Sequence, residues 1–88
     1  MIFITFVRFK KKPTKEIMAE LKRLEDKFCE EGGVVVGNFW TLGRFDAIMI
    51  TEGKDEKTAM MNSLRMSDIV STETLIAMPA EETAQLLE

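Results

Sequence analysis

The sequence predicts a small α+β domain whose elements follow the order β-α-β-β-α-β. Three observations predict this class. The chain has 88 residues, enough for one compact domain and too few for a second. Apolar residues fill four strand-like segments and recur at helical spacing in two others. Glycine, proline and helix-capping residues separate these segments. We therefore expect one domain over residues 1–88, in which residues 79–88 form a C-terminal tail.

The first strand and the first helix are expected within residues 1–31. Residues 1–9 carry apolar side chains on both alternating sets, as in a strand that is buried on both faces. Pro13 and Thr14 begin a helix, and Gly32 ends it. Its apolar residues, spaced by four, three and four positions so that they form one stripe, are Ile17, Leu21, Leu24 and Phe28.

The next two strands are expected to form a hairpin. They cover residues 34–42 and 45–52, with Gly43 and Arg44 between them. A two-residue loop that begins with glycine favours a type II′ turn, because its first central position needs a positive φ. The two strands should pair antiparallel.

A second helix and a fourth strand complete the pattern. Asp55 is suited to N-cap a helix that runs to about residue 66. We expect its packing face to consist of Met60, Met61 and Leu64. Residues 69–78 read as the fourth strand, and after Pro79 the tail has room for one or two helical turns.

This order, with right-handed crossovers, predicts a ferredoxin-like fold: an antiparallel sheet of strand order 4-1-3-2 with both helices on one face. The two central strands, however, carry apolar residues toward both faces, and helices cover only one. Monomers seldom expose large contiguous apolar patches. We therefore expect the sheet of a second copy to cover the other face, which gives a dimeric α+β barrel or a larger homo-oligomer.

Composition excludes several classes of protein. The formal net charge of -3 argues against binding to nucleic acid or to anionic membranes. Lys10, Lys11 and Lys12 form the one basic cluster, which we interpret as a solvated loop. The chain contains no histidine and therefore lacks the commonest general base and the commonest transition-metal ligand.

Cysteine usage and the N-terminus indicate the compartment. Cys29 is the only cysteine, so no intrachain disulfide can form, and we interpret it as a small packing residue. The apolar start of the chain has no preceding basic region and is interrupted by Arg8, which argues against a secretory signal or a membrane span. We expect a soluble, cytoplasmic protein.

The hairpin region carries a family resemblance. The stretch WTLGRFD at residues 40–46, continued by AIMITE at 47–52 and by TETL at 72–75, resembles the GYD domain family, which is named for a Gly-Tyr-Asp signature around such a hairpin. The resemblance covers about the whole chain and implies a ferredoxin-like, barrel-forming domain without implying an activity. The sequence departs from the pattern at Arg44 and Phe45, which follow the glycine, and at Ser71 and Ile76, where arginines are expected.

A ligand site is conceivable near this signature. Residues 46, 48, 50 and 52 share one face of the third expected strand, and residues 72, 74 and 76 share one face of the fourth. If both sets point the same way, polar groups lie in an apolar wall of the dimer cleft, as in small-molecule sites. The candidate ligand-binding residues are Trp40, Arg44, Asp46, Glu52, Thr72 and Thr74.

Each candidate also has a purely structural interpretation. Asp46 could pair with Arg44 or cap nearby backbone N–H groups and so fix the hairpin. Trp40 could be buried in the sheet or at a subunit interface. Thr72 and Thr74 could belong to an edge strand with one partly solvated face. We assign no catalytic residue and no metal ligand, and we expect no cofactor.

These residues bear on three functional classes. RNA-binding domains of the same element order need a basic-Gly-aromatic run on the third strand, where this chain has FDAIM at residues 45–49. A cofactor-independent oxygenase or isomerase would have to use a cleft carboxylate with a raised pKa, without help from histidine or tyrosine. The best-supported class is a non-catalytic module that self-associates and either binds a small molecule or serves assembly alone.

Overall fold

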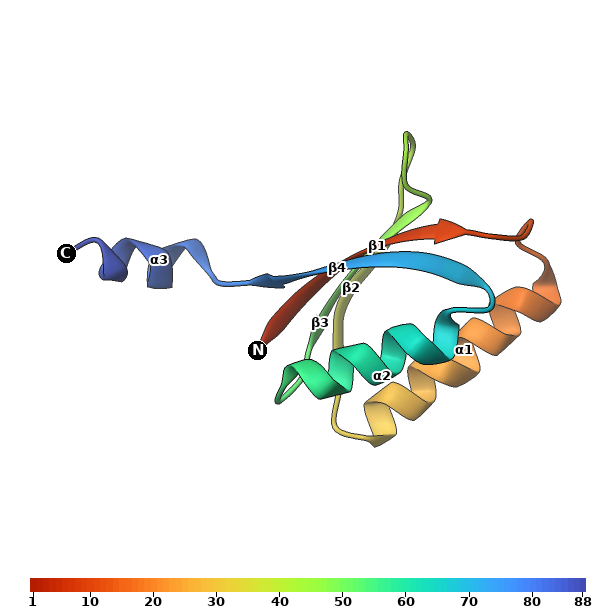
Figure 1. Ribbon diagram of the computed structural model, residues 1–88, viewed down its shortest axis with the longest axis horizontal. Helices are drawn as coiled ribbons and strands as arrows, with labels where there is room; N and C mark the ends of the chain where they lie inside the picture. The colour runs from red at the N-terminus through yellow and green to blue at the C-terminus, as the bar shows by residue number, and fades with distance from the viewer.

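A computed structural model describes residues 1–88 as one four-stranded antiparallel sheet with two helices packed on one of its faces (Figure 1). The elements are β1 (Ile2–Phe9), α1 (Lys15–Glu30), β2 (Val34–Trp40), β3 (Ala47–Glu52), α2 (Glu56–Met66), β4 (Val70–Ala77) and α3 (Ala80–Leu86). The strand order β2-β3-β1-β4 confirms the predicted order, read from the opposite edge. None of the helices combines the length and the apolar character needed to cross a membrane.

The pairing of β1 with both β3 and β4 fixes which side chains face the helices. Val7 lies opposite Ala47 on one side and Thr72 on the other, and directly opposed residues share a face of the sheet. The buried core lies between this face and the helices. It is built around Val7, Leu24, Ala47, Met66 and Val70.

Helix α1 forms where the sequence predicts it. The Thr14 hydroxyl accepts a hydrogen bond from the Ile17 backbone N–H and caps the first turn. Leu24 and Phe28 are buried, which confirms the predicted apolar stripe. The chain turns after α1 so closely past Phe28 that a Cβ atom at Gly33 would lie 2.3 Å from its ring. A larger residue at this position would displace Phe28 from the core.

Helix α2 is capped as predicted but presents a different face to the sheet. Asp55 accepts a hydrogen bond from the Thr58 backbone N–H. The predicted packing face is wrong, because Met60 and Leu64 are 61% and 64% exposed, and Met61 is exposed as well. The buried residues are Asn62 and Met66. Met66 belongs to the hydrophobic core, and its carbonyl accepts the Ile69 N–H in the tight turn into β4, so the buried face of α2 is the one that packs against α1 and β4.

The β2–β3 connection is longer than predicted. It spans residues 41–46 instead of two residues, although Gly43 does adopt a positive φ of 110°. The cause lies in β1. The Asp46 backbone N–H donates to the Val7 carbonyl, and the Asp46 carboxylate accepts from the Phe9 backbone N–H, both at 2.8 Å. Asp46, which was expected in the third strand, therefore lies in the connection but stays bonded to β1, and the loop tip projects from the sheet (Figure 1).

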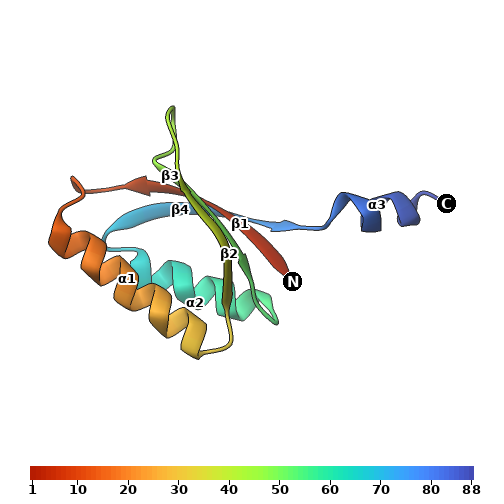
Figure 2. The same ribbon diagram turned by 180° about the vertical axis from the view of Figure 1, so that it is seen from behind.

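The second face of the sheet carries no helix, as Figure 2 shows from behind. We call it the open face. Its apolar side chains, which are partly or largely exposed, are Ile2, Ile4, Phe6, Phe39, Ile48, Ile50 and Leu75. The central strands are therefore not buried on both faces within one chain. The helix-free face that the sequence predicted is present.

The cap of α2 generates a prediction about acid stability. Hydrogen bonds from the Thr58 backbone N–H and hydroxyl lower the pKa of Asp55 below its ordinary value. A lowered folded-state pKa contributes stability above the unfolded-state pKa, and this stability is lost as the pH falls through the folded-state value. Below about pH 4, the melting temperature of the parent should therefore fall more steeply than that of Asp55→Asn. Equal losses in a thermal melt series from pH 6 to pH 3 would contradict this linkage.

Candidate functional site

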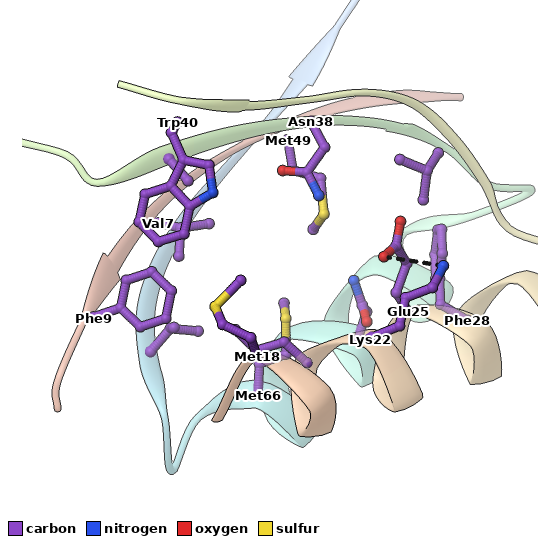
Figure 3. Close-up of a pocket in the computed structure, with 15 residues that line it drawn as sticks. Val7, Phe9, Met18, Lys22, Glu25, Phe28, Asn38, Trp40, Met49 and Met66 are labelled. Carbon is purple, nitrogen blue, oxygen red and sulfur yellow. Dashed lines mark ion pairs between the residues drawn. The ribbon is translucent and has the colours of Figure 1, made fainter. Parts of the chain in front are cut away.

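A cleft of about 340 Å³ lies on the helix side, between α1 and the β2 half of the sheet (Figure 3). It exists because α1 and α2 pack side by side over the sheet without filling the space beside β2. Most of its lining is apolar. The principal apolar residues are Phe9, Met18, Leu21, Val35, Trp40 and Met49.

An aromatic stack forms one end of the cleft. The rings of Phe9 and Trp40 lie parallel, with an interplanar angle of 3° and centroids 5.3 Å apart. They come from β1 and β2, which are separated by β3. Ala47 lies opposite both Val7 and Trp40 on the intervening strand, and its methyl group is too small to keep the rings apart. Trp40 remains 61% exposed, so the stack leaves indole surface available.

Polar groups stand at the opposite end and along the rim. Lys22 and Glu25 of α1 form an ion pair whose nitrogen and oxygen atoms are 3.9 Å apart. Asn38 reaches toward the cleft from β2, as Figure 3 shows. The site is thus an apolar trough with an amide and an exposed ion pair at its margins, and an arrangement of this kind suits a small, mainly apolar molecule.

The predicted site residues do not come together. Among the six candidates, only Trp40 lines the cleft. Thr74 lies opposite Thr5, which faces the helices, whereas Glu52 lies opposite Ile2 on the open face. The condition for this site, that both sets of residues point the same way, is therefore not met. The pairing of β3 with β1 places Glu52 opposite Ile2, and the pairing of β4 with β1 places Thr74 opposite Thr5. Ile2 and Thr5 point to opposite faces of the sheet.

Asp46 and Arg44 have separate structural roles. The Asp46 carboxylate caps the Phe9 backbone N–H at 2.8 Å, and its predicted pairing with Arg44 does not form. The Arg44 guanidinium instead lies 5.2 Å from the centre of the Phe45 ring. Asp46 and Glu52 are also separated by the length of β3, roughly 20 Å at about 3.3 Å per residue, so they cannot act on one small ligand.

The two threonines on β4 face the helix side. The Thr74 hydroxyl shares a hydrogen bond of 3.1 Å with the hydroxyl of Thr5, which is only 5% exposed. Buried hydroxyls need such partners. The Thr5–Thr74 pair accounts for Thr74 without a ligand, and Thr72 lies opposite Val7 on the same face.

Sequence reasoning missed most of the cleft. Met18 and Asn38 carry no motif, and their proximity arises from the packing of α1 beside β2. One signal was available: Ala47 is the small residue of an otherwise bulky strand, and it lies opposite Trp40 on β2. The interpretation of Cys29 as a packing residue is also wrong, because this side chain is exposed. No group of three or more His, Cys, Asp or Glu residues gathers in an arrangement that could hold a metal ion.

The Asp46 cap generates a second prediction. Removing the carboxylate in Asp46→Ala leaves the part-buried Phe9 N–H without an acceptor, which should lower the free energy of unfolding by about 1–3 kcal/mol. Asp46→Asn keeps an acceptor oxygen and should lose less. Urea denaturation followed by Trp40 fluorescence measures both. If Asn and Ala variants were equally destabilised, the charge and not the hydrogen bond to Phe9 would be the source of the stability.

Comparison with known proteins bears on the fold and not on the cleft. Among curated proteins, no sequence matches the chain. The family model of the GYD domain matches residues 3–87, nearly the entire chain and all four strands. The resemblance of the hairpin region therefore extends to a match over the domain as a whole, and the chain belongs to the GYD domain family.

Proposed function

We propose that the chain is a non-catalytic assembly module in which two copies pair through their open faces, as in a dimeric α+β barrel. The observation that carries the proposal is the open face itself. Its centre is formed by Ile4, Phe6, Ile48 and Ile50 on the two central strands, where no helix lies; of these four, Phe6 packs against Phe45 of the β2–β3 connection. These side chains are partly exposed, so covering them would add a fraction of the roughly 1.5–3 kcal/mol that the full burial of such a side chain contributes.

The distribution of charge on the open face supports the proposal. Arg8 and Glu52 lie toward opposite ends of this face, and Glu73 lies on the edge strand β4. The middle is apolar. Protein interfaces share this anatomy, with an apolar centre and a polar rim.

The accessible surface supports it as well. The chain exposes 6316 Å² for a mass of 10.1 kDa, whereas a folded monomer of this mass exposes roughly 5,300 Å². The excess of roughly 1,000 Å² compares with the 800 Å² or so that each partner buries in a standard interface. The exposed C-terminal residues 78–88 contribute to this excess together with the open face. A cytoplasmic location, where Cys29 stays reduced, belongs to the same proposal.

The assembly proposal is tested by charge insertion. Ile50→Lys places an ammonium group in the centre of the open face and should weaken dimerisation by about 100-fold or more. The matched control Leu64→Lys adds the same charge on α2, where the side chain is already 64% exposed, and should leave the association unchanged. Sedimentation equilibrium measures both, and circular dichroism checks that each variant is folded. A parent chain that is monomeric at all concentrations would refute the proposal.

The α1–β2 cleft favours a second candidate function, the binding of a small molecule. A flat apolar or aromatic compound could extend the Phe9–Trp40 stack, with Asn38 available for one hydrogen bond. The cleft offers little for catalysis. Glu25 is its only carboxylate, and this group is paired with Lys22. Binding, rather than the alternative of cofactor-independent catalysis, is therefore the use that the cleft supports.

This candidate is tested with an aromatic probe, 1-anilinonaphthalene-8-sulfonate. Trp40 is the only tryptophan, so energy transfer from its indole to the bound probe should report occupancy of the cleft. Asn38→Phe should fill part of the cleft. It should raise the dissociation constant of the probe by about 10-fold, because the probe would bury less apolar surface there. Val36→Phe, which adds the same ring on β2 outside the cleft lining, serves as the control. Equal binding by both variants would place the probe elsewhere.

A further inference from the structure

The last eleven residues, 78–88, form an arm that touches little of the rest of the chain. The arm contains α3, none of whose residues is buried, and every residue from 78 onward is exposed. Figures 1 and 2 both show it projecting from the end of β4, away from the sheet and the two packed helices. The molecule is consequently 49 Å long but only 17 Å thick.

A free helix of this length is not self-supporting. α3 has seven residues, whereas isolated helices shorter than about 12–15 residues are marginal in water. Its N-cap is Pro79, which provides no side-chain hydrogen bond to the first turn. The stability of α3 must therefore come from a surface on which it packs.

The arm has the pattern of a helix that packs on something. Ala80, Ala84 and Leu87 follow one another at spacings of four and three, which places them on one stripe. Leu87 is nevertheless 85% exposed. Glu81 and Glu82 lie off this stripe, as does Leu86, which is 72% exposed, and the stripe has no apolar partner in its own chain.

Charge distinguishes the arm from the body of the domain. Three of the 15 acidic residues lie in the arm and none of the 12 basic residues does, so the remaining 12 acidic residues balance the basic ones. The entire net charge of -3 thus resides in the arm. Two arms would repel each other, whereas an arm and a neutral body would not. The surface that the arm needs is accordingly a domain body and not another arm.

The position of the arm points to the body of a second copy. The arm continues directly from β4, whose Leu75 and Ala77 lie on the open face opposite Ile4 and Ile2. It therefore begins at the margin of the surface through which two copies pair, and a partner seated there lies beside it. The arm points away from the sheet and helices of its own chain (Figures 1 and 2). The radius of gyration, 13.9 Å, accordingly exceeds the roughly 12 Å of a compact domain of this length.

We infer that residues 78–88 form an exchanged arm, which packs through its Ala80, Ala84 and Leu87 stripe on the body of a second copy of this chain. The inference rests on the proposed pairing of the open faces. It adds a distinct contact, in which each copy supplies a helix that the other stabilises. The arm then serves as part of the dimer interface and is not a solvated tail.

Hydrogen–deuterium exchange of the full-length chain tests the inference. At concentrations where the parent is dimeric, the amides of residues 80–87 should exchange at least about 10-fold more slowly than in an unstructured peptide. In the Ile50→Lys variant under monomeric conditions, this protection should disappear while β1 and β3 stay protected. Protection that persists in the monomer would show that the arm folds onto its own chain, and an unprotected arm in the dimer would show that it is free. Either result overturns the inference.

A matched pair of arm variants gives a second readout. Leu87→Glu puts a carboxylate on the packing stripe and should raise the dissociation constant of the dimer by about 10-fold or more. Gln85→Glu adds the same charge on the opposite side of the helix and should have a much smaller effect. Equal effects of the two variants on a dimeric parent would refute the arm contact but leave the pairing of open faces standing. A parent that never dimerises would refute both.

Discussion

The structure depends on the central position of β1, which pairs antiparallel with β3 on one side and β4 on the other. Alternate residues of one strand must point to opposite faces. Phe3, Thr5 and Val7 therefore face the helices, and Ile4 and Phe6 cannot. Every neighbouring side chain inherits its face from the β1 residue that it opposes. The division between a covered core and an open apolar face follows from this one strand.

The same constraint explains where the cleft is and what it contains. The helix side of β1 ends in Phe9, whose ring meets Trp40 across the small side chain of Ala47. A larger residue at position 47 would separate the rings and fill the trough. The polar groups at the rim come from α1 and β2, neither of which pairs with β1 in the sheet. The apolar part of the site is thus determined by the sheet, and the polar part by the placement of α1.

Much of the fold could be predicted from the sequence because it is encoded locally. Hydrophobic periodicity locates the strands and α1, Thr14 and Asp55 mark the helix starts, and handedness rules convert the element order into the strand order. The failures involve contacts between residues distant in sequence. Asp46, expected in a strand, lies in the hairpin connection and accepts the Phe9 N–H, and the buried face of α2 is the one that packs against α1 and β4. The candidate site failed for the same reason, since the relative faces of Glu52 and Thr74 depend on two separate registers.

The pairing of β1 with β3 ends at Val7 and Ala47. Beyond it, the Asp46 carboxylate accepts the Phe9 backbone N–H, a bond that a main-chain carbonyl would accept in a continued sheet. The strand β3 begins at Ala47. Residues 42–45 are held by the Thr41–Asp46 backbone bond, by the Thr41 hydroxyl, which donates to the Phe45 carbonyl, and by the Phe45 ring, whose centre lies 4.8 Å from that of Phe6. Arg8 also holds the tip, but it bonds the backbone oxygen of Arg44 and so does not depend on the side chain there. Doubling the length of such a loop costs only about 0.6 kcal/mol. A longer tip would therefore cost the sheet and the core little, whereas the residues at positions 43–46 belong to the stretch through which the chain resembles its family.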